Sequence, residues 1–482
     1  MTPSDHTRRW PWLTAGFVAV VLLLYGSYRG TLVVMVHNAE EELRSKDYPI
    51  TMEELNDWYS EVPPEKNAAL LYREAYHSYK NPSVERHNLL PYVGNADAPT
   101  AMQWLTEQSR EAGMQHLARN KACLELLHGA AEKADSRYPF TLEEERGVSG
   151  LRFHLPHLPR LRQMGHLLTL QAVIRAAEGK GNKAAAAVTA LLHLARSLRN
   201  EPTMDSQNTR IRIQAEACEA LWLTLNRGCL SETELAMLQK EFSEAEKGLF
   251  RPLRRGMIGG MCLALSQKEF EEYINSRSIP PSTWSTLFGE AALKSGAVAF
   301  SKIAGFRQLD RLTALRHYRE IAEVVDLPRA ERINAIWKLA HKDLHSGLSV
   351  WNDLLHPLLD CLPESYWLWD RQSQVKIRLR LAETAVAVAR FSLKTGRLPE
   401  GLSELCPEFM REVPKDLWGG EPVGYKTTSE GYMVYSVGPD EEEDPDTRAH
   451  TGWGQGDDIA FKVWTFSADE NQAASEGEQG NR

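Results

Sequence analysis

The chain has 482 residues and a formal net charge of −9, with 25% charged and 43% hydrophobic residues. This length is enough for two or three domains, and the composition is that of an ordinary globular protein. The net negative charge argues against nucleic-acid binding, which requires a basic surface, so we expect no nucleic-acid partner.

The first predicted element is an apolar helix near the N-terminus. Residues 10–28 contain no charged side chain, and the centre from Leu13 to Tyr25 is almost wholly apolar. About 20 apolar residues span a bilayer, and aromatic residues such as Trp10 and Tyr28 favour its two interfaces. We therefore predict a transmembrane anchor over 10–28 rather than a cleaved signal peptide, because no small-residue cleavage site follows the apolar run.

Basic residues on both sides of this helix set its expected orientation. Arg8 and Arg9 precede it and Arg29 follows it at once, which favours a cytoplasmic N-terminus over 1–9 by a small margin. We therefore expect a single-pass protein of the inner (cytoplasmic) membrane with most of the chain in the periplasm. Residues 29–63 are expected to form a stalk.

Helical periodicity dominates residues 64–370, which we predict to be an all-helical domain of the solenoid or bundle type. Helices are expected at 161–179, 183–199, 207–225, 232–249 and 329–344. Residues 164–202 resemble one helix–turn–helix unit of the tetratricopeptide class, but no second copy recurs at a fixed period. A plain antiparallel pair of helices is an equal alternative.

The last predicted domain, 371–465, combines a helix with a small sheet. The helix covers 373–395 and ends at Gly396, because glycine readily adopts the left-handed conformation of a C-terminal cap. Alternation of apolar and polar residues predicts three strands, at 421–427, 432–437 and 459–464. Residues 466–482 contain no apolar anchor and are expected to be disordered.

The segment between the second and third of these strands is strongly acidic. Its carboxylates are Asp440, Glu441, Glu442, Glu443, Asp444, Asp446, Asp457 and Asp458. Such dense like charges repel one another, so either the loop stays open in water or a cation gathers the carboxylates. Calcium fits best among cations, because it accepts about six to eight carboxylate and carbonyl oxygens in flexible geometry. Magnesium prefers a tighter octahedron, and the thiol or histidine ligands of zinc are missing.

Four motifs follow one another in the C-terminal part: Gly-Arg-Leu-Pro (396–399) after a helix, Pro-Lys-Asp-Leu-Trp-Gly (414–419), Tyr-Ser-Val-Gly-Pro-Asp (435–440) and Asp-Asp-Ile (457–459). In this order they resemble the C-terminal part of the major pseudopilins of type II secretion systems. The resemblance covers residues 382–461. It implies a three-stranded antiparallel sheet and a structural calcium site. Residue by residue, it implies Asp440, Asp457 and Asp458 as calcium ligands, with Val437 supplying a backbone carbonyl.

The resemblance does not extend to the N-terminus. Pseudopilins open their apolar helix with Gly-Phe-Thr-Leu-Ile-Glu, whereas this chain has Gly-Phe-Val-Ala-Val-Val at 16–21. Without that glutamate, filament assembly is unsupported. The overall layout also looks like large membrane-anchored proteins of planctomycete-type bacteria, a resemblance that implies no activity.

Other residues that could carry chemistry are few. The six cysteines form no Cys-x-x-Cys pair. In an exported chain an even number of cysteines permits disulfides, but we expect buried free thiols. A pocket that gathered Glu143, Glu144, His154 and His157 would indicate a hydrolase with an unrecognised site in the helical domain.

The sequence favours a membrane-anchored scaffold that binds protein partners over an enzyme. A component of a secretion or pilus-like machine and the hydrolase are the alternatives. The sequence does not predict the oligomeric state.

Overall fold

The computed structural model describes residues 6–100, 104–144, 151–247, 250–265, 305–324, 366–438 and 459–464, with the single positions 295, 296, 299, 327 and 335. These residues are mainly helical and contain two small antiparallel sheets. The predicted helix at 329–344 lies outside the described residues.

Two units alternate along the chain. Met1–Tyr59, Phe140–His154 and Met257–Tyr366 form the first, here called the anchor unit. Ser60–Pro139, Leu155–Gly256 and Trp367–Arg482 form the second, the array unit. This division cuts across the expected domain of residues 64–370.

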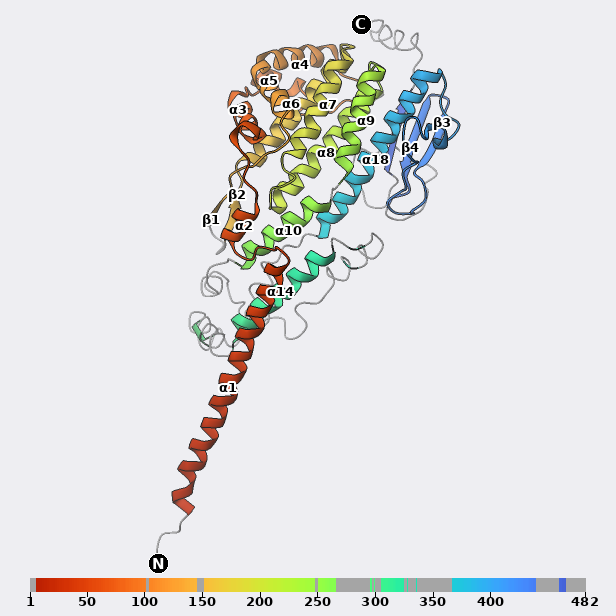
Figure 1. Ribbon diagram of the computed structural model, residues 1–482. Coiled ribbons are helices and arrows are strands. Elements are labelled where there is room, and N and C mark those ends of the chain that lie inside the picture. Colours follow the sequence, from red (N-terminus) through yellow and green to blue (C-terminus); the bar gives the residue numbers. More distant parts are fainter. Residues whose placement is uncertain are drawn as a thin grey trace, which may run out of the picture. The chain divides into compact units, whose positions relative to one another are not determined.

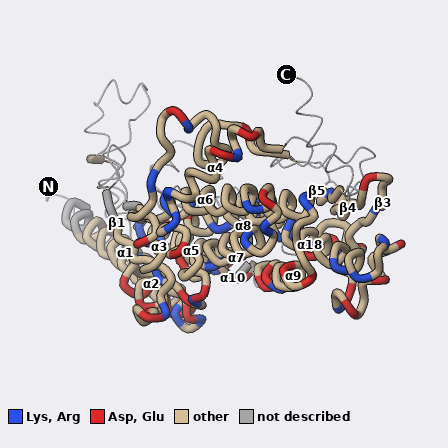
Figure 2. Tube along the Cα trace, turned by 90° about the horizontal axis from the view of Figure 1, so that it is seen from above, with Lys and Arg blue, Asp and Glu red and all other residues tan. Residues whose placement is uncertain are grey.

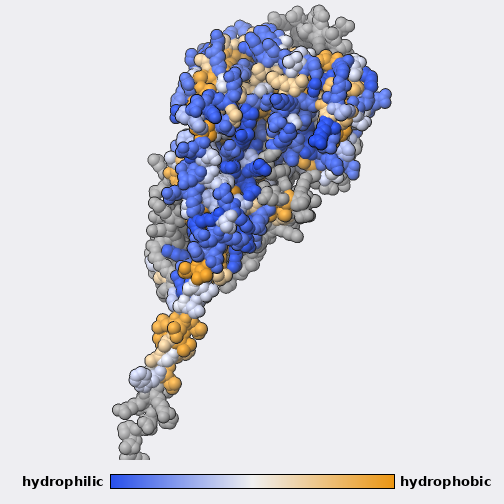
Figure 3. Space-filling view, in the orientation of Figure 1, coloured by the Kyte–Doolittle hydropathy of each residue, from blue (hydrophilic) through white to orange (hydrophobic). Residues whose placement is uncertain are grey.

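The anchor unit begins with α1 (His6–Ser45), a helix of 40 residues (Figure 1). Its stretch Trp12–Ser45 is long and apolar enough to cross a membrane. The helix continues through residues 29–45, where we expected part of a stalk. Hydrophobic side chains form patches along the projecting part of α1 (Figure 3).

The other elements of the anchor unit are α2 (Met52–Trp58), β1 (Thr141–Glu144), β2 (Leu151–His154), the second part of α10 (Phe250–Leu265) and α14 (Phe306–Val324). Thr51 caps α2, because its hydroxyl accepts the Glu54 amide while the Glu54 side chain accepts the Thr51 amide.

The antiparallel pair β1–β2 corrects the expectation of an all-helical domain over 64–370. Phe140, just before β1, fixes this pair in place. Its ring stacks on Tyr59 at a centroid distance of 6.0 Å and meets Phe153 edge-on at 5.4 Å. Four-residue strands give little alternation, so contacts between distant residues specify this pair more than local sequence does.

The array unit contains α3 (Ala68–Ser78), α4 (Glu107–Arg119), α5 (Lys121–Ala131), α6 (His157–Ala177), α7 (Gly181–Arg196), α8 (Met204–Leu225), α9 (Glu232–Glu246) and α18 (Tyr366–Thr395). It also holds the short 3₁₀ helices η1 (Pro64–Lys66), η2 (Val84–Leu89) and η3 (Leu402–Leu405). These bounds confirm the predicted helices at 161–179, 183–199, 207–225 and 232–249 to within a few residues.

The helices of the array unit lie in two layers. Figure 2 shows α6, α8 and α18 in one layer and α5, α7 and α9 in the other. Small residues allow the layers to approach closely: Ala184, Ala185 and Ala187 of α7 are fully buried. At the start of α7, a Cβ on Gly181 would lie 1.9 Å from the Cys229 carbonyl oxygen, so only glycine fits there.

The C-terminal sheet consists of β3 (Gly424–Thr428), β4 (Gly431–Ser436) and β5 (Ile459–Trp464), in the order β3-β4-β5. All pairings are antiparallel, which confirms the predicted arrangement. Gly396 ends α18 with φ = 73°, as expected.

The sheet is packed into the array unit. Tyr432 of β4 donates a hydrogen bond to the Ala385 carbonyl of α18 (2.8 Å), and Trp222 of α8 donates to the Lys462 carbonyl of β5 (2.7 Å). The C-terminal part of the chain therefore belongs to the same unit as the helical array.

Candidate functional site

Three of the predicted calcium ligands, Asp440, Asp457 and Asp458, lie outside the described residues. Val437 is described, and its amide donates to Asp416 Oδ2 at 3.0 Å. Ser436 of β4 pairs with Ile459 of β5, so the two ends of the acidic segment start from neighbouring strands.

Asp416 organises the turn that the sequence motif at 414–419 predicted. Its carboxylate is buried and accepts three hydrogen bonds, from the Val437 amide, the Ser436 hydroxyl (2.9 Å) and the Trp418 amide (3.0 Å). Both carboxylate oxygens therefore have hydrogen-bond partners, and the role of Asp416 is structural. Among the described residues, no group of three or more His, Cys, Asp or Glu side chains could hold a metal ion.

The residues proposed for a hydrolase lie on different elements. Glu143 of β1 is opposite Arg152 of β2 in the strand register, and Thr141 is opposite His154. These four positions belong to the anchor unit, whereas His157 begins α6 in the array unit.

His157 has its own partners within the array unit. Its Nε2 lies 2.8 Å from Glu201 Oε1, and its ring stacks on Tyr138 at 4.5 Å. Tyr138 in turn shares a hydrogen bond of 2.9 Å with the hydroxyl of Ser197. Because Glu201 is fully buried, this group ties the start of α6 to the end of α7 and does not form an open site.

A polar cluster on the layer of α6, α8 and α18 is the best candidate site of the array unit. We call it the α8 cluster; it consists of Tyr92, His166 of α6, Glu216 and Glu219 of α8, and Arg378 of α18. The two glutamates, three residues apart, lie on the same face of the helix. Glu216 Oε1 is 3.4 Å from His166 Nε2, and the hydroxyl of Tyr92 donates to Glu219 Oε1 at 3.3 Å.

Local sequence makes room for this cluster. Gly165 of α6 has no side chain, and a Cβ there would lie 2.8 Å from Glu216 Oε2. Tyr92 has a left-handed backbone (φ = 64°), which is uncommon for a bulky residue. Such strain persists only where surrounding contacts hold it, and the hydrogen bond to Glu219 is one of them.

The pKa values of several side chains in the α8 cluster are shifted. Burial raises the pKa of Glu219, and the nearby charge of Glu216 adds to the effect. The hydrogen bond to Glu216 raises the pKa of His166, whereas burial lowers the pKa of Arg378. Buried groups with shifted pKa values are typical of functional sites as well as of structural networks. Chemically, the cluster can exchange protons or receive a charged group of a partner.

Sequence reasoning missed the α8 cluster because no motif marks it. Tyr92 and Arg378 come from segments more than a hundred residues from Glu219, so only the fold brings them together. The one local signal is the pair of acids in α8, a helix whose other side chains around them are buried.

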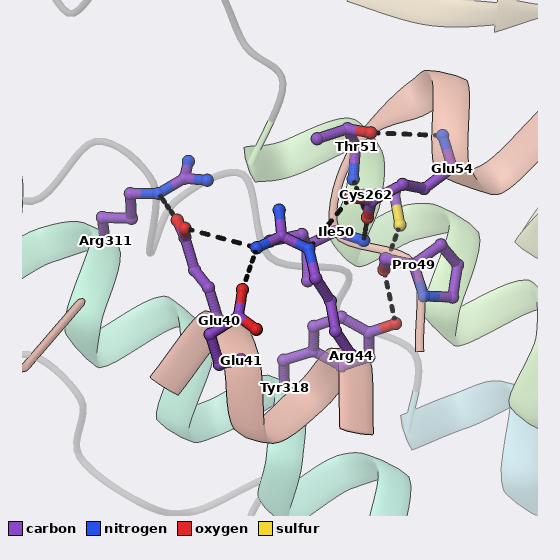
Figure 4. Close-up of polar contacts among 10 residues, drawn as sticks. All are labelled: Glu40, Glu41, Arg44, Pro49, Ile50, Thr51, Glu54, Cys262, Arg311 and Tyr318. Atoms are coloured by element: carbon purple, nitrogen blue, oxygen red, sulfur yellow. Dashed lines mark hydrogen bonds and ion pairs between the residues drawn. The ribbon is translucent and has the colours of Figure 1, made fainter. Parts of the chain in front are cut away.

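A second polar network lies at the end of α1 in the anchor unit (Figure 4). Glu40 accepts from Arg311 of α14 at 2.7 Å, and Arg44 pairs with Glu54 at 3.0 Å. Burial opposes the ionisation of Glu54, but the Ile50 amide and Arg44 outweigh it, so the pKa of Glu54 is lowered.

The same network includes a buried carbonyl. The Pro49 oxygen accepts from Cys262 Sγ at 2.8 Å and from the Tyr318 hydroxyl at 3.1 Å. Together with the ion pairs, these bonds join α1 and α2 to α10 and α14. The five cysteines of the described residues are free thiols.

Comparison with known proteins identifies no relative: no family model, curated protein or solved structure matches this chain.

Proposed function

We propose that the protein is a membrane-anchored scaffold that binds other proteins on the periplasmic side of the inner membrane. The observation that carries the proposal is the long apolar surface of α1. Large apolar side chains are exposed from Trp12 (80%) and Phe17 (71%) as far as Val34 (56%). A bare apolar stretch of this kind is costly in water and matches the hydrocarbon core of a bilayer.

Insertion of a charge into α1 tests the anchor. A charged side chain at the centre of a membrane helix costs about 2.5–3.5 kcal/mol on insertion scales. Leu22→Arg should therefore move protein from the carbonate-washed membrane fraction to the soluble fraction. Leu393→Arg, at an exposed apolar position of α18, is the matched control and should stay in the membrane. Wild-type protein in the soluble fraction would contradict the proposal.

The binding face that we propose is the layer of α6, α8 and α18 around the α8 cluster. Helical arrays present extended surfaces to protein partners. His166 and Glu216 of the cluster are partly open, with 43% and 21% of their side chains exposed. Arg212, one helical turn before Glu216 on α8, is exposed.

Site-specific photo-crosslinking in membranes tests this face. A crosslinker at Arg212 should give a discrete protein adduct, whereas one at Glu125, exposed on α5 in the other layer, should not. Glu216→Lys should abolish the Arg212 adduct because it inverts a charge at the contact. Equal adducts from both positions, or an adduct indifferent to Glu216→Lys, would reject the assignment.

We further infer that α18 and the C-terminal sheet form a pseudopilin-like module with a structural calcium site. The succession of helix, left-handed Gly396, Asp416 turn and three antiparallel strands supports this inference. Asp440, Asp457 and Asp458, with the Val437 carbonyl, would hold the ion. Its role would be to neutralise the acidic segment.

Thermal unfolding with calcium and with a chelator tests the module. Affinity of about 10⁻⁴–10⁻³ M is expected for such a site, and calcium at ten times the Kd adds about 1.4 kcal/mol of stability. Asp440→Ala and Asp458→Ala should lose this gain, whereas Asp205→Ala, at an exposed position of α8, should keep it. The same calcium response in all variants would count against the site.

A further inference from the structure

Two buried hydrogen-bond donors meet in the array unit without an acceptor among the described residues. Trp104 precedes α4, and Arg227 lies in the turn that follows α8. The guanidinium carbon of Arg227 is 4.1 Å from the centre of the Trp104 ring, so the cation lies over the indole. In the described part of the chain, neither Trp104 Nε1 nor Arg227 Nε donates a hydrogen bond, and both atoms are buried.

Orphan donors of this kind need an explanation, because buried N–H groups in proteins are almost always paired. Arg227 makes no ion pair with a carboxylate among the described residues, although a guanidinium keeps its charge when it is buried. Burial lowers the pKa of Arg227, and the Cys229 thiol opposes this only in part. Within the described part of the chain, no carboxylate serves as a counterion for this guanidinium.

The turn that carries Arg227 is fixed in place. The Arg227 amide donates to the Thr224 carbonyl at 3.2 Å, and Gly228 provides the left-handed residue (φ = 59°) that ends α8. Asn226, the preceding residue, accepts a hydrogen bond of 2.7 Å from the Trp464 amide of β5. The backbone of the turn and the contact with the Trp104 ring thus hold the Arg227 guanidinium before any ligand arrives, which reduces the entropy lost on binding.

We propose that Arg227 and Trp104 form a binding site for a carboxylate group. A carboxylate matches the planar, two-pronged edge of a guanidinium, and the indole N–H supplies a further donor. The inference builds on the proposed scaffold function, since a partner protein can supply such a group at its C-terminus. A small organic acid carries the same chemistry.

The indole N–H resonance of Trp104, assigned with Trp104→Phe, reports on this site in the detergent-solubilised full chain. Sodium acetate should move it saturably, and sodium chloride at equal ionic strength should not. Arg227→Gln should abolish the shift, and Arg227→Lys should weaken binding on the order of tenfold, because lysine cannot bind in the bidentate mode. Arg251→Gln, an exposed arginine of α10, is the matched control and should keep the wild-type response.

Titrations with a short peptide that has a free C-terminus and with its amidated form distinguish the two sources of the carboxylate. If acetate and the free peptide shift the Trp104 resonance but the amidated peptide does not, the ligand is a protein C-terminus. If only acetate shifts the resonance, the ligand is a small organic acid. No saturable acetate shift, an equal shift in Arg227→Gln, or a shift with inorganic phosphate only overturns the proposal. The acetate titration probes the site directly, so its failure leaves the crosslinking test of the scaffold unaffected.

Discussion

The anchor unit and the array unit differ in how much exposed charge joins their helices. In the anchor unit, Leu43 of α1 and Leu315 of α14 are buried, but α1 and α14 are also joined by ion pairs whose side chains stay in contact with water: Arg319 and Glu42 are 39% and 42% exposed. In the array unit, α6, α7 and α8 bury almost all of their contacting side chains completely. Exposed ion pairs contribute little to the free energy of unfolding, and salt weakens them. Close packing contributes more, and a larger side chain in such a core is destabilising.

The largest effect is expected where packing is tightest. Gly181→Ala places a Cβ 1.9 Å from a backbone oxygen of Cys229, so the chain must shift. We expect a loss of about 1–3 kcal/mol in the free energy of unfolding, measured by urea denaturation. Gly129→Ala in α5, where nothing lies within 4 Å of the new Cβ, is the control. It should be neutral or up to about 1 kcal/mol stabilising, because alanine favours helices. Similar losses in both variants would show that the array unit is less tightly packed than its structure indicates.

A second test concerns the buried charge of the array unit. The pKa of Glu219 is raised from 4.5 in the folded state, so folding favours the protonated form. Its contribution to stability is fully present below pH 4.5 and is lost as the pH rises through the raised pKa. Glu219→Gln keeps an acceptor for Tyr92 and removes this titration.

Melting temperatures measured between about pH 4 and pH 8 should therefore fall less steeply in Glu219→Gln than in wild type. Glu125→Gln, an exposed change on α5, should follow the wild-type curve. Parallel curves for wild type and Glu219→Gln would show that Glu219 is not desolvated.

The smallest effect is expected in the anchor unit. A double-mutant cycle on Glu42 and Arg319, whose charged atoms lie 3.1 Å apart, should give a coupling of about 0.2–1 kcal/mol. Hydrogen exchange of α14 measures it as the free energy of local opening. The coupling should shrink at about 1 M salt, where the screening length is near 3 Å. A larger, salt-independent coupling would mean that the anchor unit is held as firmly as the array unit.

Local sequence patterns were sufficient for the elements that depend on local interactions. The apolar run around Leu22 predicted a membrane-length helix, Gly396 predicted the end of α18, and alternation around Val434 predicted the sheet. Each signal arises from residues within a few positions of one another, because helix periodicity, capping and strand alternation are properties of the nearby backbone.

Only the tertiary structure decided which distant segments meet. It continued α1 along α14, placed α18 in one layer with α6 and α8, and paired β1 with β2. It also assembled the α8 cluster and laid Arg227 over Trp104, although no motif marks any of these residues. Such contacts depend on the burial of surfaces far apart in the sequence, and their energies are set by desolvation and packing that a local pattern does not encode.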